Sequence, residues 1–292
     1  MPKTAVILQI IPGIDTGGAE RTVIDVAEAI AMAGGRALVA SEGGRLEKEL
    51  ADAGGELIRM SAAAKNPLTI LANARKLETL IAERGVTLVH ARSRAPAWSA
   101  LLAARRAGVP FVTTYHGIYN QKGRLKSWYN GVMARGRIVI ANSQYTARIV
   151  RERHGTPEDR LRVIYRGVDL RRFDPGAVAA ERVAALRTAW GVPPGARLVV
   201  MAARLTRWKG QHVAVGAAAR ALTRPDLQDV VLILAGDDQG RTAYRDELRQ
   251  RITAMGLSER IRVTGHCADM PAAYLAASLA LMPPVLDRKS VV

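Results

Sequence analysis

Short aliphatic runs alternate with helical patterns along nearly the whole sequence, and this alternation restricts the fold more than any other feature. Residues 4–11 form an apolar run typical of a buried strand, and residues 19–33 follow with Val23, Val26 and Ile30 on one helical face. The same order continues to residue 282. Strands that alternate with helices are typical of βαβ units, in which neighbouring strands run parallel. The sequence therefore predicts an α/β fold.

A stretch rich in glycine and proline interrupts this alternation at residues 165–195. Because such residues disfavour regular elements, we interpret residues 166–195 as a connection between a first domain at 1–165 and a second at 196–292. The second series contains four expected strands, at residues 198–202, 230–235, 261–264 and 279–282. A full doubly wound domain has about six strands. The sequence thus predicts two doubly wound domains, the second of them incomplete.

The chain is strongly basic, with 43 lysines and arginines against 26 aspartates and glutamates and a formal net charge of +17. The bias is greatest in residues 84–151, which contain 12 basic residues and no acidic one. Nucleic acid, an anionic membrane surface and phosphorylated substrates would each suit this charge, and so would arginines on a solvated surface. Composition alone leaves all four interpretations open.

Two further features exclude whole classes of protein. Cys267 is the only cysteine, so the sequence has no internal disulfide and no multi-cysteine metal site, and a reducing compartment suits it. No apolar run approaches the roughly 18–20 residues that a membrane-spanning helix requires. Residues 5–14 are too short to span and lack a small-residue cleavage site, so we expect a strand there and not a signal peptide.

Two motifs of the first half follow expected strands, at the sheet edge where parallel α/β proteins bind ligands. Gly17 and Gly18 precede the first helix, where a missing Cβ lets a ligand approach the backbone and the helix N-terminus offers N–H groups to an anion. His116 precedes Gly117 at the end of another strand and can present its ring to a cleft. The alternative for the two glycines is a tight turn without a ligand, and the alternative for His116 is a purely structural role.

The most informative motif of the second half is the segment RLTRWKG at residues 204–210, between a strand and a helix. Arg204 and Lys209 are five residues apart across a turn that leads into the helix N-terminus. A planar guanidinium and a mobile ammonium at the positive end of a helix dipole suit a diphosphate. Two solvated charges in a basic protein are the alternative, and the spacing favours the diphosphate.

Two further loops of the second half follow strands and are candidate walls of a nucleotide pocket. Gly236 and Asp237 open the segment GDDQG, and Gly265 and His266 directly precede Cys267. A simple turn is the alternative for the first loop. Cys267 has no evident companion ligand or catalytic partner, so we expect a buried structural thiol.

Taken in order, these motifs resemble those of the retaining family 4 glycosyltransferases of the GT-B fold, and the resemblance covers nearly the whole chain. The segments that carry it are GGAE at residues 17–20, HG at 116–117, NS at 142–143, RGVD at 166–169 and, most specifically, RLxxxKG at 204–210. The versions RWKGQ and GDDQGR look most like bacterial members that build lipopolysaccharide or other surface glycans. The resemblance implies two Rossmann-like domains that bind a nucleotide-sugar between them, with the acceptor mainly on the N-terminal one.

The same resemblance implies roles for single residues. Arg204 and Lys209 would hold the donor diphosphate, and Gly17 and Gly18 would approach its phosphate or sugar. His116 would touch the transferring sugar as a catalytic residue. Transfer would retain the anomeric configuration, with no metal demanded by the fold and no cofactor, because the nucleotide-sugar is itself a substrate.

The sequence departs from the family at one place. The family has two glutamates, with seven residues between them, just after the strand that is expected to end near Met282. Here the segment PPVLDRKS follows at residues 283–290, and no acidic residue comes after Asp287. We therefore expect a truncated or frameshifted chain, and an inactive remnant with the same fold is one alternative function.

The acid-free residues 84–151 lie in the expected acceptor-side domain and predict contact with a membrane. Basic residues interleaved with Trp and Tyr suit anionic lipid headgroups. The expected membrane and acceptor face comprises Arg92, Arg94, Lys122, Arg124, Lys126 and Trp128. We expect a cytoplasmic enzyme on the inner face of the cytoplasmic membrane, near a glycan or lipid-linked acceptor.

Two other classes of protein compete with this interpretation. A nucleic-acid-binding protein would suit the charge, but the sequence shows no helix-turn-helix signature, zinc ligand set or RNP-like aromatic pattern, so nucleic acid is not an expected partner. A GT-B epimerase or phosphorylase would share the fold, and the spacing of Arg204 and Lys209 favours a transferase.

Overall fold

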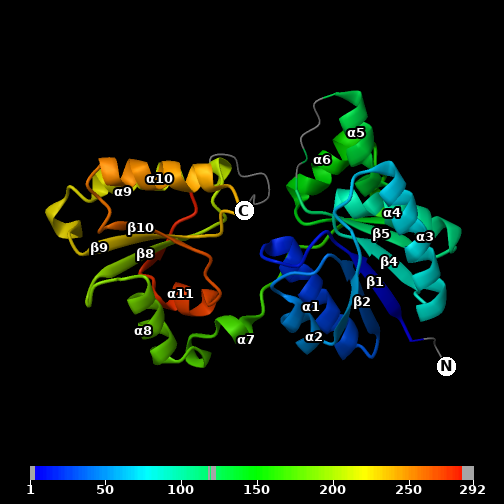
Figure 1. The fold of residues 1–292 in the computed structure, drawn as a ribbon, viewed down its shortest axis with the longest axis horizontal. Helices are drawn as coiled ribbons and strands as arrows, with labels where there is room; N and C mark the ends of the chain where they lie inside the picture. Colours follow the sequence, from blue (N-terminus) through cyan, green and yellow to red (C-terminus); the bar gives the residue numbers. More distant parts are fainter. Residues whose placement is uncertain (1–3, 118, 120–122, 285–292) are drawn as a thin grey trace. The chain divides into compact units, whose positions relative to one another are not determined.

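The computed structural model describes residues 4–117, 119 and 123–284. It contains two compact units, which meet in the sequence between Arg166 and Gly167 (Figure 1). The expected connection at residues 166–195 is wrong for its second part. Helix α8 (Ala180–Ala189) belongs to the second unit, and the next residues, Trp190 and Val192, are buried in its core.

The first unit is built on one parallel sheet. Its strands are β1 (Val6–Ile10), β2 (Arg36–Ser41), β3 (Gly55–Arg59), β4 (Leu88–Ala91), β5 (Phe111–Tyr115), β6 (Ile138–Ala141) and β7 (Leu161–Val163). They lie side by side in the order β3-β2-β1-β4-β5-β6-β7. The chain order reverses between β1 and β4, so the carboxyl ends of these two strands form the switch point at which such sheets bind ligands.

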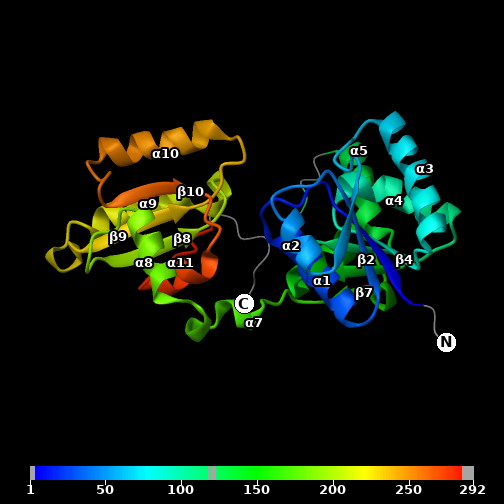
Figure 2. The same ribbon diagram turned by 60° about the horizontal axis from the view of Figure 1, so that its bottom comes forward.

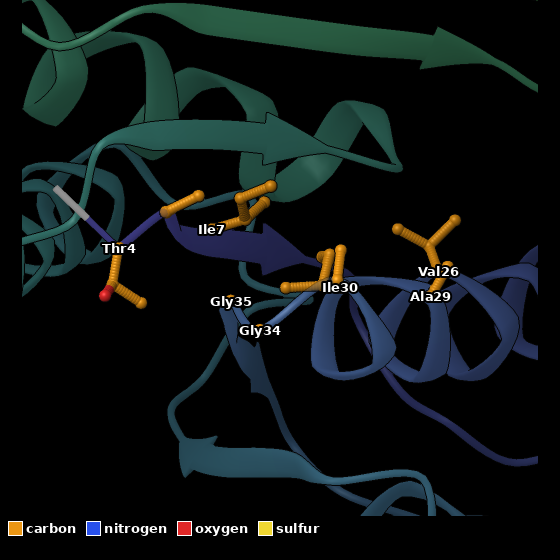
Figure 3. A pocket seen from close by; sticks show the side chains of 9 residues that line it. Thr4, Ile7, Val26, Ala29, Ile30, Gly34 and Gly35 are labelled. Atoms are coloured by element: carbon orange, nitrogen blue, oxygen red, sulfur yellow. The ribbon is translucent and has the colours of Figure 1, made fainter. Parts of the chain in front are cut away.

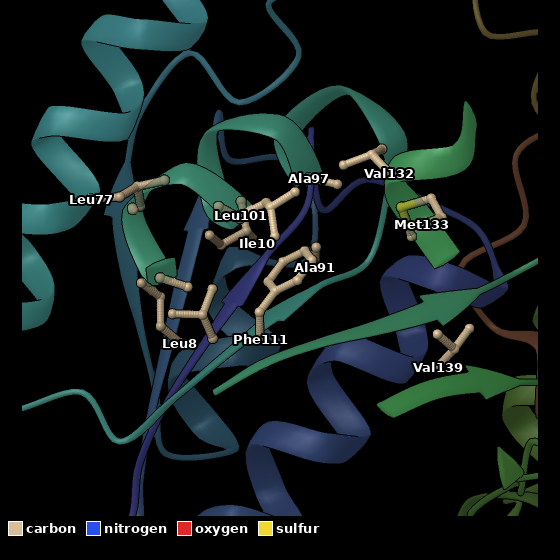
Figure 4. Close-up of a cluster of buried hydrophobic side chains, with 14 of the residues drawn as sticks. Leu8, Ile10, Leu77, Ala91, Ala97, Leu101, Phe111, Val132, Met133 and Val139 are labelled. Carbon is tan, nitrogen blue, oxygen red and sulfur yellow. The ribbon is translucent and has the colours of Figure 1, made fainter. Parts of the chain in front are cut away.

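Helices cover both faces of this sheet. They are α1 (Gly18–Met32), α2 (Glu47–Asp52), α3 (Pro67–Arg84), α4 (Arg94–Arg106), α5 (Arg124–Asn130) and α6 (Gln144–His154), with short 3-10 turns at Gly131–Ala134 and Glu158–Arg160. Alternate residues of β2 point to opposite sides: Val39 packs with α1, whereas Leu38 packs in the cluster that includes α3 and α4. Figure 4 shows that second cluster, with Ile10 near Leu101.

Local signals account for helix ends in this unit. The Asn66 side chain accepts a hydrogen bond from the Leu68 N–H at 2.8 Å, Pro67 occupies the first turn, and Gly85 ends α3 in the left-handed conformation. These signals fix both ends of α3 at Pro67 and Arg84. Helix α5 ends at Asn130, where the chain tightens into a 3-10 turn that buries Val132 in the core.

The second unit repeats the layered arrangement on a smaller sheet (Figure 2). Its strands are β8 (Arg197–Ala202), β9 (Val230–Ala235), β10 (Ile261–Gly265) and β11 (Leu279–Ala280), all parallel, in the order β10-β9-β8-β11. Its helices are α7 (Leu170–Phe173), α8, α9 (Gln211–Ala221), α10 (Thr242–Ala254) and α11 (Met270–Ala276), with 3-10 turns at Pro175–Ala177, Arg207–Lys209 and Pro225–Leu227. Helices α9 and α10 pack on one face and α8 and α11 on the other.

Gly236 lies where the chains leaving β8 and β9 come closest. A Cβ at this position would overlap the carbonyl of Ala203 and the amide of Arg204, which are backbone atoms that cannot move aside cheaply. The glycine expected as part of a nucleotide pocket is thus required by packing between two backbones.

Replacing Gly236 with alanine is expected to lower the free energy of unfolding by at least about 2 kcal/mol, because two backbone segments must separate. Urea denaturation followed by circular dichroism measures this. Gly216→Ala is the matched control: its Cβ would meet only the Arg251 Nη2 atom, at 3.6 Å, inside α9. That variant should be unchanged or up to about 1 kcal/mol more stable. Equal denaturation midpoints in both variants would contradict the packing argument.

Candidate functional site

Three loops meet at the carboxyl edge of the second sheet, and they are the loops that carry the motifs of the second half. The Leu205 N–H donates to the Asp237 carbonyl at 3.0 Å, which joins the loops after β8 and β9. The Gly236 N–H donates to the Gly265 carbonyl at 2.7 Å, which adds the loop after β10. The structure therefore brings together the segments that begin at residues 204, 236 and 265.

The segment at residues 204–210 is held rigidly before α9. The buried Gln211 side chain donates to the Arg204 carbonyl at 2.9 Å. Gly210 has a φ of 85° and lies so close to the Pro283 carbonyl that any Cβ would overlap it. Because of this turn α9 begins at Gln211, and Lys209 ends a 3-10 turn.

The two cations of this motif have different surroundings. The Lys209 Nζ atom lies 4.6 Å from the centre of the Trp208 ring. The Arg204 Nη1 atom donates to the Gln239 Oε1 atom at 3.1 Å. The sequence predicted roles for Arg204 and Lys209 but none for Gln239 of the GDDQG segment, because its contact with Arg204 spans 35 positions of the chain.

The remaining residues of the expected nucleotide pocket are less enclosed. Asp237 is half-buried, and its Oδ1 atom accepts from the Gln239 N–H at 2.7 Å. His266 is exposed. Cys267 is half-buried, whereas a buried thiol was expected, and desolvation raises the pKa of this thiol. Its partial exposure follows from its place in a loop rather than in a strand.

In the first unit, the structure brings the glycine turn and the histidine motif to one place. Gly17 caps α1, and the Arg166 guanidinium lies against Gly18. The Arg166 Nη2 atom is also 2.7 Å from the His116 Nδ1 atom. His116 is 7% exposed at the carboxyl end of β5. Arg166 begins the RGVD motif, which did not by itself predict this contact.

The contact with Arg166 determines which ring nitrogen of His116 carries hydrogen. A guanidinium group can only donate hydrogen bonds, so the Nδ1 atom of His116 accepts. The imidazole is then neutral in this arrangement, with its hydrogen on Nε2. His116 is therefore prepared to donate a hydrogen bond and not to take up a proton at Nδ1.

The prediction that Arg92 belongs to the membrane face is wrong. Its side chain is only 3% exposed and lies at the switch point of the sheet. Its Nε atom donates to the Gln9 Oε1 atom at 3.0 Å, and the Gln9 Nε2 atom donates to the Val23 carbonyl of α1 at 3.0 Å. Desolvation, together with the nearby positive charge of Arg166, lowers the pKa of Arg92 to about 9. A neutral amide therefore holds this guanidinium inside the protein.

The other residues of the expected membrane face separate into two groups. Arg124, Lys126 and Trp128 are exposed on α5, and the Trp128 ring stacks on Trp98 with ring centres 4.5 Å apart. Arg94 is half-buried instead, because its guanidinium lies 4.0 Å from the Tyr119 ring centre and donates to Asn130 at 2.8 Å. Lys122 lies outside the described residues, as does the segment after residue 284, where the family has its glutamates.

A further cavity, of about 490 Å³, lies at the other end of the first sheet (Figure 3). It is lined by Thr4 and Ile7 near the start of β1 and by Val26, Ile30 and Gly34 at the far end of α1. Its lining carries no ionisable side chain, so this cavity offers no chemistry for transfer. Within the described ranges, no helix is long and apolar enough to cross a membrane. In the same ranges no three His, Cys, Asp or Glu side chains group as metal ligands.

The sequence matches two family profiles. Residues 16–172 match Glycosyltransferase Family 4, and residues 183–287 match Glycosyl transferases group 1. The chain therefore belongs to the family 4 glycosyltransferases.

Similar proteins agree with this assignment. A glycosyltransferase structure from Rickettsia africae ESF-5 is 31% identical, with a TM-score of 0.83 and coverage of 98% of this chain and 74% of that one. Anabaena Alr3699/HepE in complex with UDP and glucose is 26% identical, with a TM-score of 0.81 and coverage of 98% and 76%. The expected GT-B fold with two Rossmann-like units is thus confirmed.

Among relatives of known name, D-inositol 3-phosphate glycosyltransferase 1 of Catenulispora acidiphila is 29% identical over 214 residues, or 67% of this chain and 50% of the relative. The corresponding enzyme of Nocardiopsis dassonvillei is 31% identical over 192 residues, or 60% and 43%. The chain spans about half the length of the curated relatives it matches.

Burial of His90 predicts a dependence of stability on pH. Desolvation, with the nearby charge of Arg92, holds the pKa of His90 well below the usual value. Below a pH of about 6.5 the unfolded chain binds a proton at His90 that the folded chain does not, so stability falls by up to about 1.4 kcal/mol per pH unit. His90→Gln should lose stability less steeply in urea denaturation between about pH 7.5 and 5. Identical slopes would contradict this prediction.

Proposed function

We propose that this chain moves a sugar from a nucleotide-sugar to a glycan or lipid-linked acceptor, with retention of the anomeric configuration. The observation that carries the proposal is the rigid turn at the carboxyl edge of the second sheet, which presents Arg204 and Lys209 directly before α9. A UDP-sugar is the donor to test first, since Anabaena Alr3699/HepE has been solved in complex with UDP-glucose and is 26% identical.

The two units would contribute differently to transfer. Arg204 and Lys209 would stabilise the negative charge that develops on the departing nucleoside diphosphate, which is the electrostatic role of preorganised donors. Gly17 and Gly18 would let the donor approach the start of α1. His116, with hydrogen on Nε2, would donate a hydrogen bond to a hydroxyl of the transferring sugar and orient it.

Two classes of acceptor are supported by different observations. The RWKGQ and GDDQGR segments favour lipopolysaccharide or another surface polysaccharide. The names of the relatives favour a small phosphorylated alcohol such as D-inositol 3-phosphate. The Arg166 guanidinium beside His116 would suit a phosphate on such an acceptor.

We also propose that α5 docks on an anionic membrane surface at the inner face of the cytoplasmic membrane. Leu125 is 81% exposed and Trp128 is 55% exposed, and they are three residues apart on one helix. Arg124 and Lys126 flank them, and the Arg135 guanidinium lies 5.8 Å from the Trp128 ring centre. Exposed apolar side chains bordered by cations suit the headgroup region of anionic lipid.

Alanine at Arg204 or Lys209 is expected to lower transfer from UDP-glucose at least about 100-fold, because each change removes a cation from the leaving group. Radiolabelled transfer measures this, with a membrane lipid extract and D-inositol 3-phosphate as separate acceptors. Arg220→Ala, at an exposed position of the neighbouring helix α9, should keep wild-type turnover. Wild-type turnover in Arg204→Ala or Lys209→Ala would refute the donor-site assignment, and the acceptor that becomes labelled distinguishes the two classes.

Vesicle co-sedimentation at low salt tests the membrane proposal. The protein should bind phosphatidylglycerol vesicles more tightly than phosphatidylcholine vesicles. Lys126→Glu should weaken this binding about 30-fold, because the reversal changes the charge by two at about 1 kcal/mol per charge. Lys76→Glu reverses the same charge at an exposed position of α3 and should bind like the wild type. Equal binding to both vesicle types would count against docking through α5.

A further inference from the structure

A cationic cavity lies on the second unit beside the donor motif. It has a volume of about 390 Å³ and is lined by Arg204, Thr206, Arg207, Trp208, Arg241 and Tyr244. Arg204 belongs to the motif described above, whereas Arg241 ends the GDDQGR segment just before α10 and had no predicted role. Aromatic walls and several guanidinium groups are features that suit a phosphate-bearing ligand.

The positive charges around this cavity are compensated unequally. The Arg207 Nη1 atom is 3.0 Å from the Glu247 carboxylate, so its charge is balanced within the protein. The Arg204 and Arg241 guanidinium groups instead share one neutral acceptor, the Gln239 Oε1 atom, at 3.1 and 3.2 Å. Among the described residues neither of these two arginines has a carboxylate within ion-pair distance.

Two more observations indicate that this arrangement serves a ligand. Gln239 has a φ of 51°, a left-handed conformation that is unfavourable for a residue with a Cβ and that persists only where surrounding contacts hold it. Thr206 lines the cavity, and its hydroxyl is buried and lacks a hydrogen-bond partner within the described part of the chain. A phosphate oxygen would accept hydrogen bonds from this hydroxyl and from both guanidinium groups.

We propose that Arg241, held beside Arg204 by Gln239, binds the terminal phosphate of the leaving nucleoside diphosphate and makes the site prefer this product to the nucleotide-sugar. The inference rests on the proposed function. Transfer breaks the bond between the anomeric carbon and the β-phosphate oxygen, and the electron pair stays on that oxygen. The acceptor hydroxyl oxygen bonds the anomeric carbon and its proton passes to water.

The charge balance of this step explains why a third cation matters. The terminal phosphate of the product carries about one more negative charge than the same phosphate in the nucleotide-sugar at a pH of about 8, well above its second pKa near 6. Arg204 and Lys209 would meet the diphosphate in both substrate and product. The attraction between Arg241 and the phosphate grows as the extra negative charge appears. Arg241 therefore stabilises the departing diphosphate more than the bound nucleotide-sugar.

Isothermal titration of the full chain with UDP, UDP-glucose and inorganic phosphate tests the inference. Arg241→Ala should weaken UDP binding about tenfold and UDP-glucose binding less than about twofold. Gln239→Gly relieves the left-handed strain and removes the shared acceptor, so it should keep or raise the unfolding midpoint and still weaken UDP binding selectively. Arg249→Ala, an exposed arginine further along α10, is the matched control and should bind both nucleotides like the wild type.

Each other outcome overturns a defined part of the argument. Equal weakening of UDP and UDP-glucose by Arg241→Ala would refute the selectivity for product. An effect of Arg204→Ala without one of Arg241→Ala would refute this inference alone. No effect of Arg204→Ala, or no binding of UDP by the wild type, would refute the proposed donor site as well. Inorganic phosphate that binds as tightly as UDP and is lost in Arg241→Ala would indicate a free-phosphate site instead.

Discussion

A single buried amide connects the elements on which the first unit depends. Gln9 reaches from β1 to the Val23 carbonyl of α1 and to the Arg92 guanidinium after β4. These elements meet at the switch point, so the amide aligns the helix start that carries Gly17 and Gly18 with the strand ends near His116. A buried amide needs hydrogen-bond partners for both its N–H groups and its oxygen. The Gln9 amide finds them on α1 and just after β4, and so joins three elements.

Glutamine side chains also hold the candidate site of the second unit in place. Gln211 secures the turn at residues 204–210, and Gln239 draws Arg204 toward Arg241. In both units glutamine oxygens therefore position arginines without cancelling their charge. A carboxylate in either place would satisfy the guanidinium and leave less attraction for a phosphate. Arginines bonded to neutral amides therefore lie at the carboxyl edges of both sheets.

Much of the fold and part of the site could be predicted from the sequence. The helix at 67–84 is delimited by Asn66, Pro67 and Gly85, which act through bonds to near neighbours. The loops after β8, β9 and β10 had to meet at one edge, because the carboxyl ends of parallel strands do so. The sequence could not show which basic residues of 84–151 are buried and which are exposed. Arg92 is buried and Arg124 is exposed, although both belong to the same acid-free stretch.

The sequence by itself determined the α/β alternation, the strand-end positions of its motifs and the membership of a glycosyltransferase family, because these depend on periodicity, turn residues and local spacing. Only the tertiary structure decided that Gln9 meets Arg92, that Arg166 fixes the hydrogen of His116, and that Gln239 joins Arg204 to Arg241. Most of these contacts span 35 to 83 positions of the chain. A side chain's charge is visible in the sequence, but its effective strength depends on burial and on the neutral or ionic partner that folding places beside it.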